Sequence, residues 1–99
     1  MVIFLDMIIN FADKETEKLF MKGVSRKYPP EIIRRAIQLL FIIDSAAGLE
    51  DLSSPPGNKL HRLSGDMKGC WSISINKQWR IVFRFEDENA YDVKITDYH

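Results

Sequence analysis

The last third of the chain alternates apolar and polar residues with a period of two, and this pattern constrains the fold more than any other feature. It runs through residues 71–76, 79–85 and 91–96. Because successive side chains of a β-strand point to opposite faces, the pattern predicts three antiparallel strands with one apolar and one polar face. The predicted apolar face carries Trp71, Ile73, Ile75, Trp79, Ile81, Phe83, Phe85, Tyr91, Val93 and Ile95.

The turn between the first two of these strands follows from the same pattern. Both apolar faces must lie on one side of the sheet, and a two-residue turn would place an apolar residue opposite a polar one. A three-residue turn over residues 76–78 instead pairs Ile75 with Trp79 and Ser74 with Arg80. We therefore expect this three-residue turn.

The first half of the chain predicts a strand followed by two helices. Residues 1–11 are rich in Val, Ile, Leu and Phe and form the predicted first strand. Asp13 is placed to cap a short helix that ends at Gly23, and Pro30 is placed in the first turn of a longer helix. Apolar residues recur at every third or fourth position of the longer helix, which predicts a buried face formed by Ile33, Ala36, Ile37, Leu40, Ile43 and Ala47.

Two further segments complete the predicted architecture. Residues 49–57 contain two prolines and are expected to connect the second helix to the sheet, and residues 58–63 are expected to form another strand. In that strand Leu60 is expected to face the core, with Lys59 and His61 on the polar side. The order of a strand, two helices and a run of strands predicts an α+β fold, with the N-terminal strand and the helices on one face of a mainly antiparallel sheet.

Length and composition exclude several classes of protein. The 99 residues fit a single domain over residues 1–99. One cysteine, Cys70, cannot form an internal disulfide, which indicates a reducing, cytoplasmic compartment. The apolar N-terminal segment is shorter than the roughly 20 residues that span a bilayer, so no membrane partner is expected. The chain has no glycine-rich nucleotide loop and no zinc-ligand spacing, so we expect no cofactor and no metal.

Charge is distributed unevenly although the fourteen basic and fourteen acidic residues cancel. From residue 59 to residue 84 the basic side chains are opposed only by Asp66, whereas after Phe85 five acidic residues accompany Lys94. A basic sheet face suits a phosphate backbone because each cation displaces a condensed counterion, and the competing interpretation is a solvated strand face. The candidate RNA-binding residues are Lys59, Arg62, Lys68, Lys77 and Arg84, together with Arg80.

The two histidines, His61 and His99, suggest a more specific chemistry. RNA cleavage by its own 2′-hydroxyl needs a base, an acid and a cation for the phosphorane charge, and no metal. Imidazole, with an ordinary pKa of about 6.5, suits either proton-transfer role, and Arg80 can meet the phosphate charge. In the plainer interpretation His61 is a surface side chain, Asp97-Tyr98-His99 is a loose end, and Arg80 pairs with the acidic tail.

Several stretches of the sequence, spread from about residue 7 to residue 99, together match a known family. They are residues 11–18 (FADKETEK), 49–52 (LEDL), 55–58 (PPGN), 65–66 (GD), 71–73 (WSI), 75–76 (IN), 78–81 (QWRI), 90–93 (AYDV) and 97–99 (DYH). The pattern resembles HigB-type toxins of the RelE/ParE superfamily, also called plasmid maintenance system killer proteins. Family members usually start at the position of Met7, so residues 1–6 are expected to be an N-terminal extension.

This resemblance implies a RelE-like fold and a cytoplasmic toxin that cuts mRNA in the ribosomal A site. It also implies a HigA-type helix-turn-helix antitoxin as partner, through which the pair contacts operator DNA and represses its own operon. Catalytic or RNA-contacting positions of the family correspond to residues that the chemistry had already indicated. These are His61, Arg80, Asp97, Tyr98 and His99.

Two departures from the family pattern lead us to expect reduced activity. Relatives commonly carry Lys at the position of Ser64 and Arg at the position of Ser74, so two positive charges are missing here. Two alternatives to a ribosome-dependent mRNA endonuclease therefore stay open. The chain is then either a weakly catalytic co-repressor that mainly binds its antitoxin, or a gyrase inhibitor like the ParE toxins that share the fold.

Overall fold

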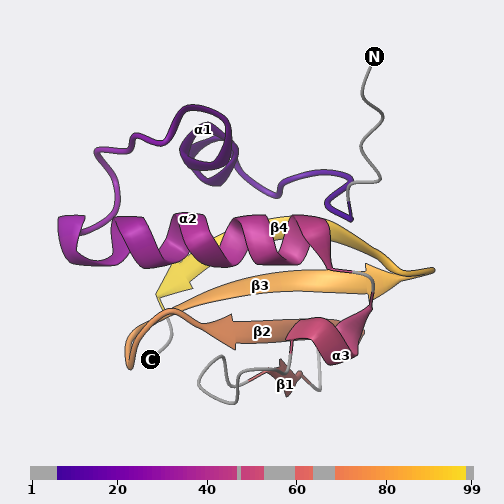
Figure 1. Cartoon of the computed structure of the whole chain (residues 1–99). Helices are drawn as coiled ribbons and strands as arrows, with labels where there is room; N and C mark the ends of the chain where they lie inside the picture. The colour runs from indigo at the N-terminus through magenta and orange to yellow at the C-terminus, as the bar shows by residue number, and fades with distance from the viewer. Residues whose placement is uncertain (1–6, 47, 53–59, 64–68, 98–99) are drawn as a thin grey trace.

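The fold is a layer of helices on one face of a four-stranded antiparallel sheet, which confirms the predicted α+β class (Figure 1). The computed structural model describes residues 7–46, 48–52, 60–63 and 69–97. Across the sheet the strands follow chain order. They are β1 (His61–Arg62), β2 (Cys70–Ser74), β3 (Trp79–Glu86) and β4 (Asn89–Asp97).

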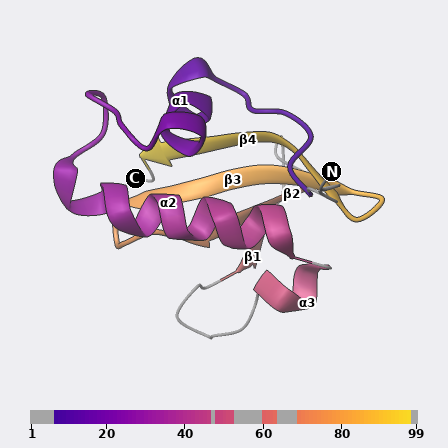
Figure 2. The same cartoon turned by 45° about the horizontal axis from the view of Figure 1, so that its top comes forward.

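The first helix begins and ends where its capping residues predict, and the second begins at the predicted proline, Pro30. In α1 (Lys14–Lys22) the Asp13 side chain accepts a hydrogen bond from the first turn, and Gly23 ends the helix with a left-handed φ of 73°. The longer α2 (Pro30–Ser45) packs across β3 and β4, and α1 packs on α2 and β4 (Figure 2). A short helix, α3 (Leu49–Leu52), lies where the sequence predicted only a connecting loop.

The buried stripe of α2 matches the prediction at Ala36, Leu40 and Ile43 and differs from it at other positions, while Ala47 lies outside the described residues. Ile32 and Leu39 are fully buried, whereas the predicted Ile33 and Ile37 are only partly buried. Apolar residues occupy so much of this helix that two neighbouring stripes both fit the helical period, and contact with the sheet selects one of them. The core therefore forms between this stripe and the inner sheet residues, which include Ile73, Ile81, Phe83, Val93 and Ile95.

The register between β2 and β3 is the predicted one. Ser74 pairs with Arg80, and the Ile75 N–H donates to the Trp79 carbonyl at 2.8 Å. The turn therefore contains residues 76–78, as the matching of apolar faces requires.

The N-terminal segment and β1 are shorter than predicted within the described residues. Ile8 and Phe11 each form an isolated parallel bridge to β4, at Ala90 and Val93, while residues 1–6 lie outside the described residues. Hydrogen bonds on both sides of these bridges cover the outer edge of β4. β1 covers only two residues of the predicted strand 58–63, although Leu60 packs against the core as expected and residues 58–59 are outside the described part.

A β-bulge in β4 changes the facing of one aromatic residue. Val82 pairs with Lys94 but Arg84 pairs with Tyr91, so β4 has one extra residue between these pairs. Asp92 lies at this irregularity with a left-handed φ of 54°. The prediction that Tyr91 shares the apolar face is therefore wrong, because the bulge moves its side chain to the opposite face.

Candidate active site

The side chains of the candidate site lie on the open face, which we define as the sheet face opposite α1 and α2. Core residues on each strand point to the helices, so their strand neighbours point to the open face. Within the described part of the chain no helix covers this face (Figures 1 and 2). Its residues are His61, Cys70, Ser72, Ser74, Arg80, Val82, Arg84, Tyr91, Lys94 and Thr96.

Arg80 and His61 are both neighbours of one buried serine, Ser72. The register places His61 directly opposite Ser72, and the Arg80 guanidinium donates from Nη1 to the Ser72 Oγ at 3.0 Å. Ser72 is fully buried, Arg80 is half-buried and His61 is exposed. An exposed imidazole and a guanidinium held by a buried hydroxyl therefore share one part of the open face.

The sequence offered no signal for the role of Ser72. A serine that alternates with Trp71 and Ile73 reads as an ordinary solvent-facing strand residue. Its burial and the diagonal hydrogen bond from Arg80 distinguish it from Ser74, whose hydroxyl donates to the Asn76 carbonyl in the turn.

Asp97 lies at the end of the sheet rather than on the open face. It pairs with Trp79, one residue beyond the pair of Arg80 and Thr96, and the Gln78 side-chain amide donates to its carboxylate at 3.1 Å. β2 and β4 both end, and β3 begins, at this end of the sheet (Figure 1). Asp97 and Arg80 are therefore near neighbours, while Tyr98 and His99, the other predicted members, lie outside the described residues.

A buried polar contact supports the same end of the sheet from the helix side. The hydroxyl groups of Thr16 and Tyr28 lie 3.2 Å apart, and Thr16 also accepts a hydrogen bond from the Ile95 N–H at 3.0 Å. The ring of Tyr28 meets Trp79 edge to face, with 5.8 Å between centroids. Burial raises the pKa of Tyr28 above its usual value of 10.0, which favours the neutral phenol beside Thr16.

Within the described part of the chain, the other predicted RNA-binding cations do not gather beside Arg80. Arg62 pairs with Trp71, so it lies on the helix side of the sheet, where its guanidinium sits 5.2 Å from the Trp71 ring centroid. Lys77 is exposed on the turn between β2 and β3. Lys59 and Lys68 lie outside the described residues. The expectation of one continuous basic face is therefore wrong for Arg62.

Arg84 shares the open face but is surrounded by acidic partners. It pairs with Glu86 in an ion pair, its Nε lies 3.6 Å from the Asp92 carboxylate, and its guanidinium sits 4.6 Å from the Tyr91 ring centroid. The hairpin turn beyond it has left-handed φ values at Asp87 and Glu88, as a two-residue turn requires. These two carboxylates oppose the positive charge of Arg84. Glu86 and Asp92, which belong to the acidic tail after Phe85, therefore pair with Arg84.

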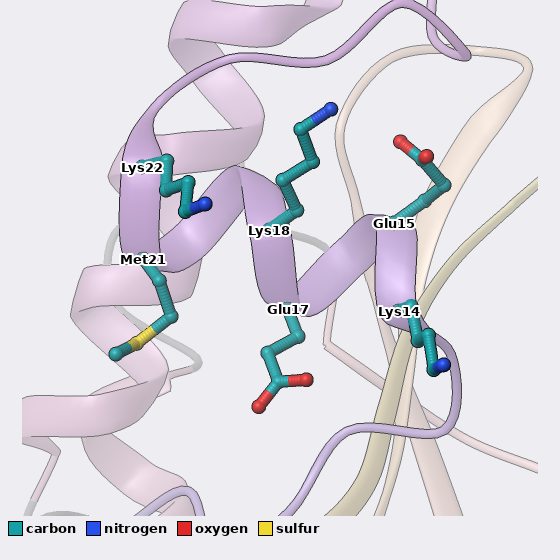
Figure 3. Close-up of a pocket in the computed structure, with 6 residues that line it drawn as sticks. All are labelled: Lys14, Glu15, Glu17, Lys18, Met21 and Lys22. Carbon is teal, nitrogen blue, oxygen red and sulfur yellow. The ribbon is translucent and has the colours of Figure 1, made fainter.

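A surface hollow on α1 is a poor candidate for a competing site. The hollow is lined by six residues of α1, but their side chains spread away from the helix and carry both signs of charge (Figure 3). Among the residues that the structure describes, no three potential metal ligands gather in one place. In the same part of the chain no helix is long and apolar enough to cross a membrane.

The sequence matches one family of known proteins over almost its whole length. Residues 9–99 match the family described as RelE-like toxin of type II toxin-antitoxin system HigB. The chain is 39% identical to Endoribonuclease HigB of Proteus vulgaris over 94% of its own length and all of the relative's. It is 37% identical to Toxin HigB-1 of Vibrio cholerae, over 82% of its length and 86% of the relative's.

A solved structure shows the same fold at low sequence similarity. The YoeB-YefM complex from Staphylococcus aureus aligns with a TM-score of 0.53 and 14% identity, over 99% of both chains. This likeness supports the RelE-like fold that the resemblance implied. With the family match over almost the whole chain, the conclusion is that this protein belongs to the RelE-like HigB toxins of type II toxin-antitoxin systems.

Proposed function

We propose that the protein is a ribosome-dependent mRNA endonuclease that inhibits translation as the toxin of a type II pair. The observation that carries this proposal is the buried Ser72 hydroxyl, which holds the Arg80 guanidinium on the same face as the exposed His61. A fixed cation beside an imidazole suits phosphodiester cleavage, since the transition state gains negative charge while protons move. The name of the Proteus vulgaris relative, Endoribonuclease HigB, supports the same activity.

In this mechanism the RNA supplies its own nucleophile. A base removes the 2′-hydroxyl proton, the oxygen attacks the adjacent phosphorus, and an acid protonates the departing 5′-oxygen. Arg80 stabilises the pentacovalent phosphorane, and His61 takes one of the proton-transfer roles. Asp97, Tyr98 and His99 complete the proposed catalytic set, and the assignment of base and acid among His61, Asp97 and His99 stays open.

The proposed partners follow from the family rather than from a contact in this chain. A toxin of a type II pair has an antitoxin, for which we propose the HigA type. The ribosome and mRNA are the proposed targets in the cytoplasm, and operator DNA is reached only through the antitoxin. Lys59, Lys68 and Lys77 remain proposed contacts to the RNA backbone.

The test is expression without antitoxin, followed by mapping of mRNA 5′ ends. We expect new ends within translated frames, lost in His61→Ala and in Arg80→Gln but kept in Lys18→Gln, an exposed site on α1. Intact mRNA with a normally folded protein contradicts the proposal. Double-strand DNA breaks under those conditions indicate a gyrase inhibitor instead.

One observation favours the weakly catalytic co-repressor as a second candidate. Ser74 lies directly opposite Arg80 and brings no charge to it, because its side chain is neutral. Its hydroxyl donates to the Asn76 carbonyl in the turn. If the natural chain leaves mRNA intact and Ser74→Arg makes it toxic, the co-repressor becomes the better description.

A further inference from the structure

Lys94 belongs to the open face, although its position in the sequence groups it with the acidic tail. Its neighbours Val93 and Ile95 are both buried in the core. Lys94 pairs with Val82, and Val82 pairs with Ser72. Because the bulge in β4 lies on the other side of this pair, the alternation is unbroken and the Lys94 side chain projects from the open face.

This position makes Lys94 a diagonal neighbour of Arg80. Arg80 pairs with Thr96, two residues after Lys94, and diagonal neighbours in antiparallel strands lie about 7–8 Å apart, within reach of long side chains. On the other flank of Arg80, Ser74 is uncharged. The sheet thus has a second cation beside Arg80, supplied by β4 rather than by β2.

The surroundings of Lys94 differ from those of Arg84, a third cation on this face. Arg84 contacts Glu86 and Asp92, whereas within the described part of the chain no carboxylate forms an ion pair with Lys94. The carboxylate of Asp92, two residues away on β4, is occupied by the Asn10 side chain as well as by Arg84. A lysine without such a carboxylate, next to the guanidinium of Arg80, suits an external anion.

We propose that Lys94 binds the phosphate backbone of the RNA substrate beside the phosphate that Arg80 stabilises. This inference rests on the proposed function, because it takes RNA as the ligand of the open face. Lys94 thereby supplies, from β4, the second positive charge beside Arg80 that the uncharged Ser74 does not supply from β2. The reaction itself is unchanged, since Lys94 adds binding and charge stabilisation but transfers no proton.

The test separates RNA binding from cleavage. The probe is a single-stranded 2′-O-methyl RNA oligonucleotide, which lacks the nucleophile, and its dissociation constant is measured at a series of salt concentrations. For single strands each lost phosphate contact lowers the slope of log K against log salt by about 0.7. We expect Lys94→Gln to bind several-fold more weakly at low salt with a slope lower by about 0.7, and Lys94→Arg to retain both values.

Two further variants are needed. One tests the effect of losing a positive charge elsewhere on the protein, and the other tests a cation added at Ser74, on the opposite side of Arg80. Lys18→Gln on α1 removes the same charge far from the open face, so its slope should equal that of the natural chain. Ser74→Arg in the Lys94→Gln background should restore the slope by placing a cation on the other side of Arg80. Thermal unfolding of each variant establishes that it is folded before binding is compared.

The outcomes distinguish this inference from the proposed function. A slope that falls only in Lys94→Gln supports Lys94 as a phosphate contact, even if the natural chain cleaves no mRNA. Equal slopes for Lys94→Gln and Lys18→Gln overturn it, even if the natural chain cleaves mRNA and Arg80→Gln does not. Absence of salt-dependent binding by the natural chain also overturns it.

Discussion

The two ends of the open face both carry an arginine, yet the contacts around them are opposite in kind. At one end a neutral, buried Ser72 hydroxyl holds Arg80. At the other end, Glu86, Asp92 and the ring of Tyr91 surround Arg84. A hydroxyl orients a guanidinium without opposing its charge, whereas the carboxylates of Glu86 and Asp92 oppose the charge of Arg84. A count of basic residues therefore does not locate an anion site until the partners of each residue are known.

The largest expected difference between the two ends is catalytic. Arg80→Gln should lower the rate of mRNA cleavage at least about a hundredfold, because it removes a group that stabilises charge in the transition state. Arg84→Gln should lower the rate by less than about threefold, because its charge is already paired. Cleavage of a reporter mRNA in a purified translation reaction measures both rates.

Equal losses in the two variants contradict this comparison. Each protein is first checked by circular dichroism, since Arg84 also connects β3 to the bulge in β4. A large loss for Arg84→Gln with an unchanged spectrum means that its charge reaches the RNA in spite of its carboxylate partners.

A smaller catalytic effect is expected from the residue that holds Arg80. Ser72→Ala removes the acceptor of a hydrogen bond from a charged group, which is worth about 1.5–3 kcal/mol in typical cases, so the rate should fall about tenfold. Ser74→Ala is the matched control, because the same truncation on the same strand removes only a turn contact. A fall in kcat with little change in KM indicates positioning of Arg80, and equal kcat values for the two variants argue against it.

The sequence predicted those parts of this arrangement that depend on periodicity. The pairing of Ser74 with Arg80 follows from matching apolar faces, and the helix ends follow from Asp13 and Gly23. The same reasoning placed His61 and Arg80 on one polar face, which the register agrees with. Alternation succeeds here because one face of the sheet must be buried.

The sequence did not predict the facing of a side chain where one extra residue interrupts the period. Nor did it predict which charged side chains form ion pairs. The bulge at Asp92 moves Tyr91 to the open face, and no local pattern announces it. Arg84 was grouped with the RNA-binding cations, because a charge count does not reveal the ion pairs that form across strands. Lys94 was grouped with the acidic tail for the same reason, since a neighbour in the chain need not be a neighbour on the sheet.

The two ends of the open face should also differ in how they affect stability. A change at the Arg84 end should lower the free energy of unfolding without lowering cleavage. At the Arg84 end, the Asn10 side chain donates to the Asp92 carboxylate at 3.0 Å and accepts from the Asp92 N–H at 2.9 Å. Asn10→Ala removes both contacts at an exposed site, so we expect a loss of about 1–2 kcal/mol in the free energy of unfolding. Cleavage by the remaining folded protein should be unchanged, because Arg80 is at the other end. Urea unfolding and the cleavage assay test the two statements, and a cleavage loss larger than the unfolded fraction contradicts the second.

The smallest expected effect is on stability, comes from Tyr28 on the helix side of the sheet, and depends on pH. Tyr28→Phe keeps the ring against Trp79 but removes the hydroxyl beside Thr16, so stability at pH 8 should fall by about 1 kcal/mol or less. Burial raises the pKa of Tyr28, so above about pH 10 the unfolded chain ionises this phenol while the folded chain does not. The contribution of Tyr28 is therefore complete below pH 10 and is lost as the pH rises further. Urea unfolding at about pH 8 and about pH 10.5 should show that the difference in free energy of unfolding between the two proteins becomes smaller at the higher pH. A difference that becomes larger means that the phenol is not buried in its neutral form.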